Sequence, residues 1–347
     1  MEAILNPALL LFLSGILIGI LFKLILPNSI SKYLGYYLLL SLGLKGGSSL
    51  QENGFINEVI SALTLGVVFA LLIPFIAYFY LKNLLNSDDA AALSGTYGSV
   101  SAVTFVTAIA YLSTTNQEFD NYMSAVLVVM EFPAIFMALY LVTHNKQNKG
   151  NNLETIKTAF LEIPNIILIS SLFFGYFLNK TLLSNLDFII VEIFDYVLYV
   201  FLFVMGTRVA KRIGELKGKG ASLIAFALLT PLMGSLIALL ASLNFNFSVG
   251  NATLLMVLTA SASYIAVPAV VKDAIPNANP AIYLGLSLGI TFPFNIIVGI
   301  PLYNELAKYF IGWLEKEPSV DGYNLTRNPR CIITWKKVNQ TSYIFWF

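Results

Sequence analysis

Residues 261–268 read S-A-S-Y-I-A-V-P, and they interrupt an apolar run that is typical of a membrane helix. The apolar residues 254–258 precede this stretch and residues 269–271 follow it. Serine and tyrosine lower helix propensity, and proline removes an N–H donor and clashes with the preceding turn. Broken backbone at membrane depth is tolerated only where it is buried in protein or lines a water-filled cavity. The stretch therefore predicts a discontinuous helix beside a binding site.

The rest of the chain is strongly apolar. Of its 347 residues, 57% are hydrophobic and 11% are charged, whereas about a quarter of the residues in soluble proteins are charged. A helix needs roughly 20 apolar residues to cross a bilayer. We therefore predict an all-α polytopic membrane protein with ten transmembrane helices, at about 7–25, 28–44, 59–81, 89–112, 121–143, 160–178, 187–207, 221–242, 249–271 and 279–306.

Composition also argues against several classes of function. The net charge of +1 argues against a nucleic-acid partner, and a single histidine with a single cysteine makes a zinc or haem site improbable. The chain has no phosphate-binding loop, dinucleotide motif or nucleophile–base pair. We expect a protein that is not an enzyme and has no organic cofactor.

Loop charges predict the orientation, because lysine and arginine concentrate in short cytoplasmic loops. The loops after the odd-numbered spans contain twelve of the twenty lysines and arginines, at Lys23, Lys32, Lys82, Lys146, Lys149, Lys157, Arg208, Lys211, Arg212, Lys217, Lys219 and Lys272, and five more lie in the tail. The other loops contain only Lys45 and Lys180. Both termini are therefore expected outside, in a multi-pass protein.

The two halves of the sequence resemble each other. Residues 130–135 and 290–295 share a Thr/Glu-Phe-Pro pattern, and Pro133 and Pro293 are separated by the same offset of 160 that aligns Ser101 with Ser261. Five helices per half is an odd number, so the second copy must be inverted. Inverted repeats with matching interrupted helices are characteristic of secondary transporters. We predict a first repeat at 1–143, a cytoplasmic linker at 144–159, a second repeat at 160–312 and a tail of unassigned role at 313–347.

Both repeats contain a weak point in the fourth helix of the copy. Residues 94–104, S-G-T-Y-G-S-V-S-A-V-T, match residues 259–268 across the repeat, which predicts discontinuous fourth and ninth helices. Freed N–H groups at such breaks suit an anion, and carbonyls with hydroxyls suit Na⁺. Small residues can instead serve close helix packing, the reading we give to Gly15/Gly19, Gly43/Gly47 and Gly285/Gly289. The match across the repeat favours a site at the two breaks.

Glu131 lies inside the fifth predicted helix. A carboxylate at that depth is costly and by default functional. It could pair with bound Na⁺ or carry a proton, and the alternative is a simple hydrogen bond to a neighbouring helix. Asn295, another polar residue in mid-span, could cap broken backbone or contribute to a cation site.

Several segments together resemble the sodium-dependent bicarbonate transporter (Sbt) family. The resemblance covers residues 8–310 and is carried by G-L-K-G-G at 43–47, G-T-Y-G-S-V-S at 95–101, M-E-F-P-A at 130–134, A-S-A-S at 260–263, I-P-N-A-N-P at 275–280 and G-I-P-L-Y at 299–303. It implies a gate domain of the first, second, sixth and seventh helices, and a core of helices three to five and eight to ten. It also implies a homotrimer in the lipid of a bacterial inner (plasma) membrane and a cytoplasmic PII-like regulator.

The resemblance places bicarbonate where the fourth and ninth helices cross. The substrate-binding residues expected there are Ser99, Ser101, Ala102, Val103, Ser263 and Tyr264. The cation-binding residues are Thr104, Glu131, Ser261 and Asn295, with Na⁺ possible at Ser101, Thr104, Glu131 and Ser261. The chain departs from the family pattern at four of these or neighbouring positions: Tyr264 replaces an aspartate, Ala266 and Val103 replace serines, and Glu131 replaces an aspartate.

We expect a secondary active transporter that couples Na⁺ to the symport of bicarbonate or a related small anion by alternating access. Two alternatives stay open. One is a Na⁺/H⁺ antiporter-like or organic-anion carrier of the same fold, in which Glu131 exchanges protons. The other is a transport-inactive receptor or scaffold that binds a regulator through residues 208–219.

Overall fold

The computed structural model describes residues 7–24, 26–145, 161, 163–178, 186, 188–215, 220–265, 267–268, 271 and 275–315. Within these ranges the chain is helical, without strands. Most of the predicted linker, nearly all of the tail at 313–347, and Ala266 lie outside the described residues.

Twelve of the described elements are α-helices of seven or more residues, and the remainder are short helical turns. The helices are α1 (Pro7–Phe22), α2 (Asn28–Asn53), α3 (Asn57–Leu81), α4 (Ser87–Gly98), α5 (Ala102–Thr114), α6 (Met123–Asn145), α8 (Ile163–Phe177), α10 (Phe194–Glu215), α11 (Ala221–Phe245), α12 (Val249–Ala260), α14 (Pro280–Leu286) and α16 (Ile300–Glu315). The turns are η2 (Phe188–Glu192), η3 (Ser287–Thr291), α15 (Phe292–Phe294) and η4 (Asn295–Gly299).

Five segments are long and apolar enough to cross a membrane. They are Asn57–Leu81, Ser87–Thr114, Ile190–Arg212, Ala221–Phe245 and Pro280–Gly312. Three shorter helices, α1, α8 and α12, are apolar as well. The fold is therefore that of an all-helical membrane protein, and its division into ten spans stays a prediction.

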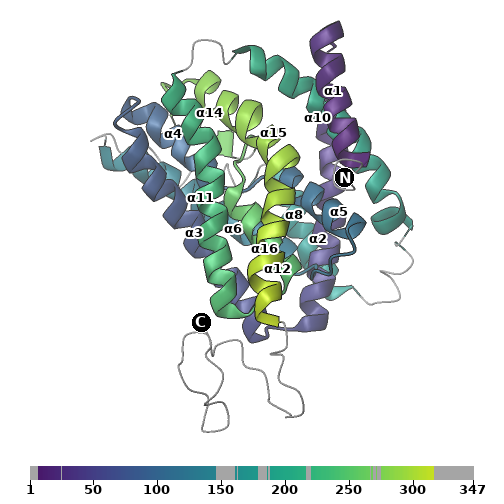
Figure 1. Cartoon of the computed structure of the whole chain (residues 1–347). Helices are drawn as coiled ribbons and strands as arrows, with labels where there is room; N and C mark the ends of the chain where they lie inside the picture. Colours follow the sequence, from purple (N-terminus) through teal and green to yellow (C-terminus); the bar gives the residue numbers. More distant parts are fainter. Residues whose placement is uncertain are drawn as a thin grey trace.

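The helices pack in two groups (Figure 1). In one group α1 packs along α10 and α2 along α8, with α2 also touching α10. In the other, α3 packs on α4 and α6, while α11 and α16 pack on α12. The fourth and ninth predicted spans belong to this second group.

Glycines bring the helices of the first group into backbone contact. A Cβ on Gly15 would meet the Phe203 carbonyl of α10, and a Cβ on Gly206 would meet the Phe12 carbonyl of α1. The same holds between α2 and α8, where Gly47 lies against the Leu172 carbonyl. The packing role predicted for Gly15/Gly19 and Gly43/Gly47 is confirmed, and that of Gly285/Gly289 stays a prediction.

Two helices extend beyond the ends that hydropathy predicted. α10 continues to Glu215, so Arg208, Lys211 and Arg212 are helical rather than in a loop. α2 continues to Asn53, and within it the Lys45 ammonium lies 4.5 Å from the centroid of the Phe194 ring. An apolar run marks where lipid ends and not where a helix ends; in α10, lysine and arginine follow the run, and as good helix formers they let the helix continue.

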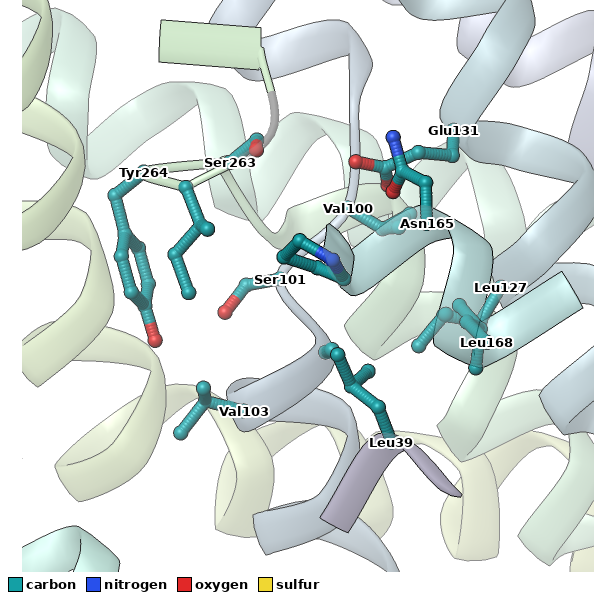
Figure 2. Close-up of a pocket in the computed structure, with 13 residues that line it drawn as sticks. Leu39, Val100, Ser101, Val103, Leu127, Glu131, Asn165, Leu168, Ser263 and Tyr264 are labelled. Atoms are coloured by element: carbon teal, nitrogen blue, oxygen red, sulfur yellow. The ribbon is translucent and has the colours of Figure 1, made fainter. Parts of the chain in front are cut away.

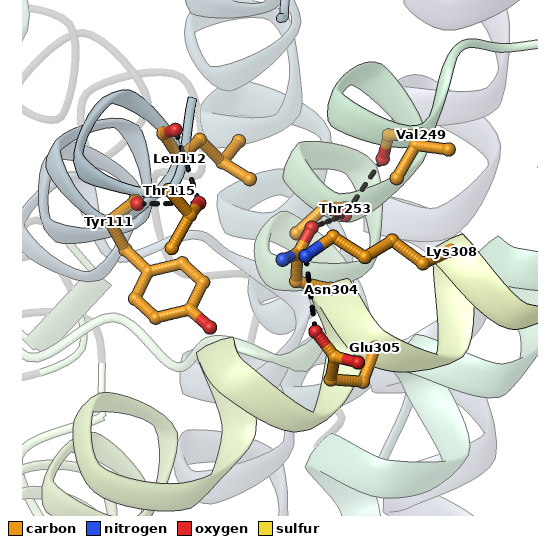
Figure 3. Close-up of polar contacts among 8 residues, drawn as sticks. All are labelled: Tyr111, Leu112, Thr115, Val249, Thr253, Asn304, Glu305 and Lys308. Carbon is orange, nitrogen blue, oxygen red and sulfur yellow. Dashed lines mark hydrogen bonds and ion pairs between the residues drawn. The ribbon is translucent and has the colours of Figure 1, made fainter. Parts of the chain in front are cut away.

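Polar contacts tie α12 to α16 (Figure 3). The Thr253 hydroxyl donates to the Val249 carbonyl at 2.7 Å and lies 3.4 Å from the Asn304 amide oxygen. One turn further along α16, Lys308 and Glu305 form an ion pair at 3.1 Å on the exposed face. α12 is thereby held against a neighbouring helix near its N-terminal end, away from the site at its C-terminal end.

Candidate functional site

The helical backbone stops in both segments where the sequence predicted weak points. α4 ends at Gly98 and α5 begins at Ala102, while Ser99 and Ser101 adopt extended conformations between them. Ser101 begins α5 because its hydroxyl accepts the Thr104 N–H at 3.2 Å, the usual role of serine at a helix N-cap. In the second segment α12 ends at Ala260, and residues 261–263 are not helical.

The two interruptions touch each other. The Ser101 N–H donates to the Ser261 hydroxyl at 3.0 Å, and the Ser263 N–H donates to the Thr96 carbonyl at 2.7 Å. Ser101 and Ser261 are the pair that the sequence aligned at an offset of 160. Backbone groups freed by one interruption thus find partners on the other, which satisfies polar groups that lipid could not.

Asn295 closes the end of α12. Its amide nitrogen donates to the Ala260 carbonyl at 2.8 Å, and its amide oxygen accepts the Tyr303 hydroxyl at 2.9 Å. Both polar atoms of Asn295 are therefore engaged. The structure gives this residue the capping position that was one of its two predicted roles.

A cavity of about 50 Å³ lies beside the crossing (Figure 2). Roughly 10–15 Å³ of such volume holds one water, so the cavity has room for a small ion with few heavy atoms. Six of the ten predicted site residues line it: Ser101, Ala102, Val103, Glu131, Ser263 and Tyr264. The other four, Ser99, Thr104, Ser261 and Asn295, are buried around it. Of these, Thr104 donates its hydroxyl to that of Ser101 at 2.9 Å.

Among the described residues that line this cavity, Glu131 has the only carboxyl. Its side chain comes from α6 and is only 7% exposed. Ser99 lies close enough to interact with it electrostatically, whereas none of the described residues lining the cavity is lysine or arginine. A buried carboxylate needs a compensating partner. A bound cation, a proton or hydrogen bonds from neighbouring polar groups such as Ser99 could supply it.

Sequence reasoning missed Asn165, which also lines the cavity and is buried. It comes from the start of α8, directly after Pro164, and Figure 2 shows its amide and the Glu131 carboxyl pointing toward one another. The only available signal was a polar residue near the start of the sixth apolar run. Asn165 brings an amide from the first helix group, which also lines the cavity with Leu39, Pro164 and Leu168.

Tyr264 closes one side of the cavity. Its side chain is 9% exposed, and its ring packs edge-on against Phe292 with centroids 5.3 Å apart. The hydroxyl is buried and makes no hydrogen bond of good geometry with the described residues, although Ser101 and Arg208 are close enough to interact with it electrostatically. Figure 2 shows the hydroxyls of Tyr264 and Ser101 facing the same space. They are two polar groups positioned to meet a ligand.

An all-helical membrane protein in which two helices end beside a buried polar cavity has features expected of a transporter for a small solute. The sequence matches the Na⁺-dependent bicarbonate transporter superfamily over residues 7–308, and the chain belongs to this family. Membership indicates Na⁺-dependent bicarbonate transport in general and Na⁺ as the coupling ion. A comparison with curated proteins finds no match.

Proposed function

We propose that the chain is a secondary active symporter that moves Na⁺ and bicarbonate, or a related small anion, through the cavity at the α4/α5 and α12 interruptions. The observation that carries the proposal is the buried carboxyl of Glu131, with no lysine or arginine among the described residues around it, in a small cavity lined by serine and tyrosine hydroxyls.

Charge balance provides the coupling. An anion about 4 Å from an ionised Glu131 would be repelled by about 4 kcal/mol at the effective dielectric of partly buried sites. A Na⁺ held between them by the carboxylate and nearby hydroxyls converts this repulsion into attraction, since hard cations prefer oxygen ligands. In the proposed mechanism, each ion therefore stabilises binding of the other.

The anion would be held by donors at the start of α5 and by hydroxyls. The first N–H groups of a helix have no intrahelical acceptor and carry partial positive charge. Ala102 and Val103 are the first two residues of α5, and both line the cavity. The Ser101 hydroxyl accepts from Thr104 and so has its own proton to donate. Tyr264 would supply a second hydroxyl donor in place of a charged side chain.

Alternating access requires two related halves, and several contacts support the inverted repeat. α1, α2, α8 and α10 are the first, second, sixth and seventh predicted helices. If the first corresponds to the sixth and the second to the seventh, the contact of α1 with α10 in one arrangement corresponds to the contact of α8 with α2, and both contacts are present. Near the start of α4, Asp89 accepts the Asn279 N–H at 2.6 Å, and near the start of α12, Asn251 accepts the Asp120 N–H at 2.8 Å. Each half thus anchors a loop of the other in the same way.

The proposal includes the remaining features that the family resemblance implies. These are ten spans with discontinuous fourth and ninth helices, a homotrimer in a bacterial inner membrane, and a cytoplasmic PII-like regulator. Both termini outside follows from the loop charges. The cytoplasmic side is then the side of Lys32 and of the C-terminal end of α10.

Uptake of labelled bicarbonate into proteoliposomes tests the proposal. An inward Na⁺ gradient should stimulate uptake severalfold over an equal choline gradient. Uptake that ignores Na⁺ but follows an imposed pH gradient would replace symport by the proton-exchange alternative, which the buried Glu131 carboxyl also permits. If no small anion is transported, the hypothesis of a transport-inactive receptor or scaffold would remain.

A further inference from the structure

A second, larger cavity of about 520 Å³ adjoins the site. Six residues line both cavities and stand between the small one and the large one: Leu39, Ala102, Val103, Pro164, Tyr264 and Ile265. The large cavity continues past Phe201 and Met205 of α10 to the exposed side chains of Lys32 and Lys211. It forms a vestibule that joins the site to one membrane surface.

The vestibule wall is basic. Lys32, Arg208, Lys211 and Arg212 line it, and none of the described residues on its wall is aspartate or glutamate. A cleft lined by one sign of charge between apolar walls concentrates the opposite charge. The small cavity has the reverse character, with Glu131 and no described lysine or arginine on its wall. An anion would thus meet positive charge in the vestibule and a carboxyl in the inner cavity.

Arg208 is the basic residue of the vestibule that lies within electrostatic range of Tyr264, which lines both cavities. Its guanidinium is half-buried on α10, one turn before Lys211 and Arg212, and it interacts electrostatically with the Tyr264 hydroxyl. Arg208 comes from the first helix group and Tyr264 from the second. A guanidinium and a phenol on the wall of one cavity offer several donors, a combination suited to a planar oxyanion.

We propose that Arg208 and Tyr264 form a second anion-binding station, at the inner end of the basic vestibule, through which the transported anion passes between the cytoplasm and the site. The inference rests on the proposed anion transport and adds a binding residue from the gate helices. A small anion at this station accepts a charge-assisted hydrogen bond from Arg208. Its binding from the vestibule side therefore depends on this side chain.

The test uses right-side-out and inside-out proteoliposomes containing the full-length chain, with labelled bicarbonate presented to one side at a time. Arg208→Gln should raise the KM for bicarbonate on the vestibule side about tenfold, the usual effect of losing a charge-assisted hydrogen bond. The KM on the opposite side should stay within about twofold. Arg208→Lys, which keeps the charge, should recover most of the loss. Lys82→Gln removes an exposed lysine that does not line the vestibule and should change neither KM.

An unchanged vestibule-side KM in Arg208→Gln, with wild-type protein transporting normally, would overturn the inference and leave the proposed function intact. A wild type without Na⁺-dependent uptake would overturn the proposed function itself. If Arg208→Gln does not yield folded protein, the salt dependence of the wild-type KM still tests the inference. Raising ionic strength with choline gluconate at constant Na⁺ should raise the KM on the vestibule side alone, because salt screens the basic wall. An equal response on both sides would contradict the station.

Discussion

Glu131 is the residue on which the proposed coupling depends. Glu131→Gln removes the negative charge that Na⁺ would neutralise, so the anion should bind without Na⁺, and the stimulation of uptake by a Na⁺ gradient should fall to less than about twofold. Labelled bicarbonate uptake with and without the gradient measures this. Ser124→Ala is the matched control, because Ser124 is buried on the same helix and its hydroxyl has no hydrogen bond among the described residues. Full Na⁺ coupling in Glu131→Gln would remove Glu131 from the mechanism.

Asn295 supports the site by hydrogen bonding to the backbone of Ala260 and not by contacting the ligand. Asn295→Leu would leave the Ala260 carbonyl and the Tyr303 hydroxyl without their partners, at a cost of about 1–3 kcal/mol for each buried group. We expect a clear fall in the thermal unfolding midpoint of the detergent-solubilised protein. Asn244→Leu should have little effect, since Asn244 is exposed and bonds only to a carbonyl of its own helix, that of Leu240. Equal midpoints for the two variants would contradict the capping role.

At the scale of elements, the contact between α1 and α10 depends on the absence of a side chain at Gly206. A Cβ there would meet the Phe12 carbonyl and lie 2.8 Å from the Ile16 nitrogen, so Gly206→Ala should destabilise the protein by about 1–3 kcal/mol through overpacking. Gly312→Ala is the control, because a Cβ at Gly312 meets nothing within 4 Å and alanine favours the helix by about 1 kcal/mol. Thermal unfolding should therefore shift in opposite directions. If the unfolding midpoints of both variants shifted in the same direction, α1 and α10 would be able to move apart and accommodate the added methyl group.

The interrupted elements could be predicted from sequence because helix-weakening residues and prolines stand out in an apolar background. Their contact, Ser101 with Ser261, followed from the repeat. Asn165 and Arg208 could not be predicted in the same way. They come from α8 and α10, and no periodicity or spacing within those helices indicates which distant residues they will face. Hydropathy also could not predict the C-terminal end of α10, because an apolar run indicates where the lipid boundary lies and not where the helix ends.

At the scale of the whole molecule, the basic vestibule and the loop charges point to the same membrane side. Lys32 and Lys211 lie at the outer part of the vestibule, and both are in the set that predicts the cytoplasmic face. On the side predicted to face outside, the Asn251 amide donates to Asp120 and Glu58 at 2.7 and 2.9 Å. The conformation is therefore interpreted as the one open toward the cytoplasm.

Sidedness of labelling tests this interpretation directly. Cys331 is the only cysteine in the sequence, so Cys331→Ser gives a background in which single cysteines can be placed at Lys32 and at Glu118, both exposed and predicted on opposite faces. A membrane-impermeant maleimide should label Lys32→Cys only in inside-out vesicles and Glu118→Cys only in intact cells, because charge bias in short loops fixes orientation. The reverse pattern would place the vestibule outside. Arg208 would then bind the anion on its way into the cell. The inward Na⁺ gradient would drive ions into the vestibule from outside and would not drive their release from it.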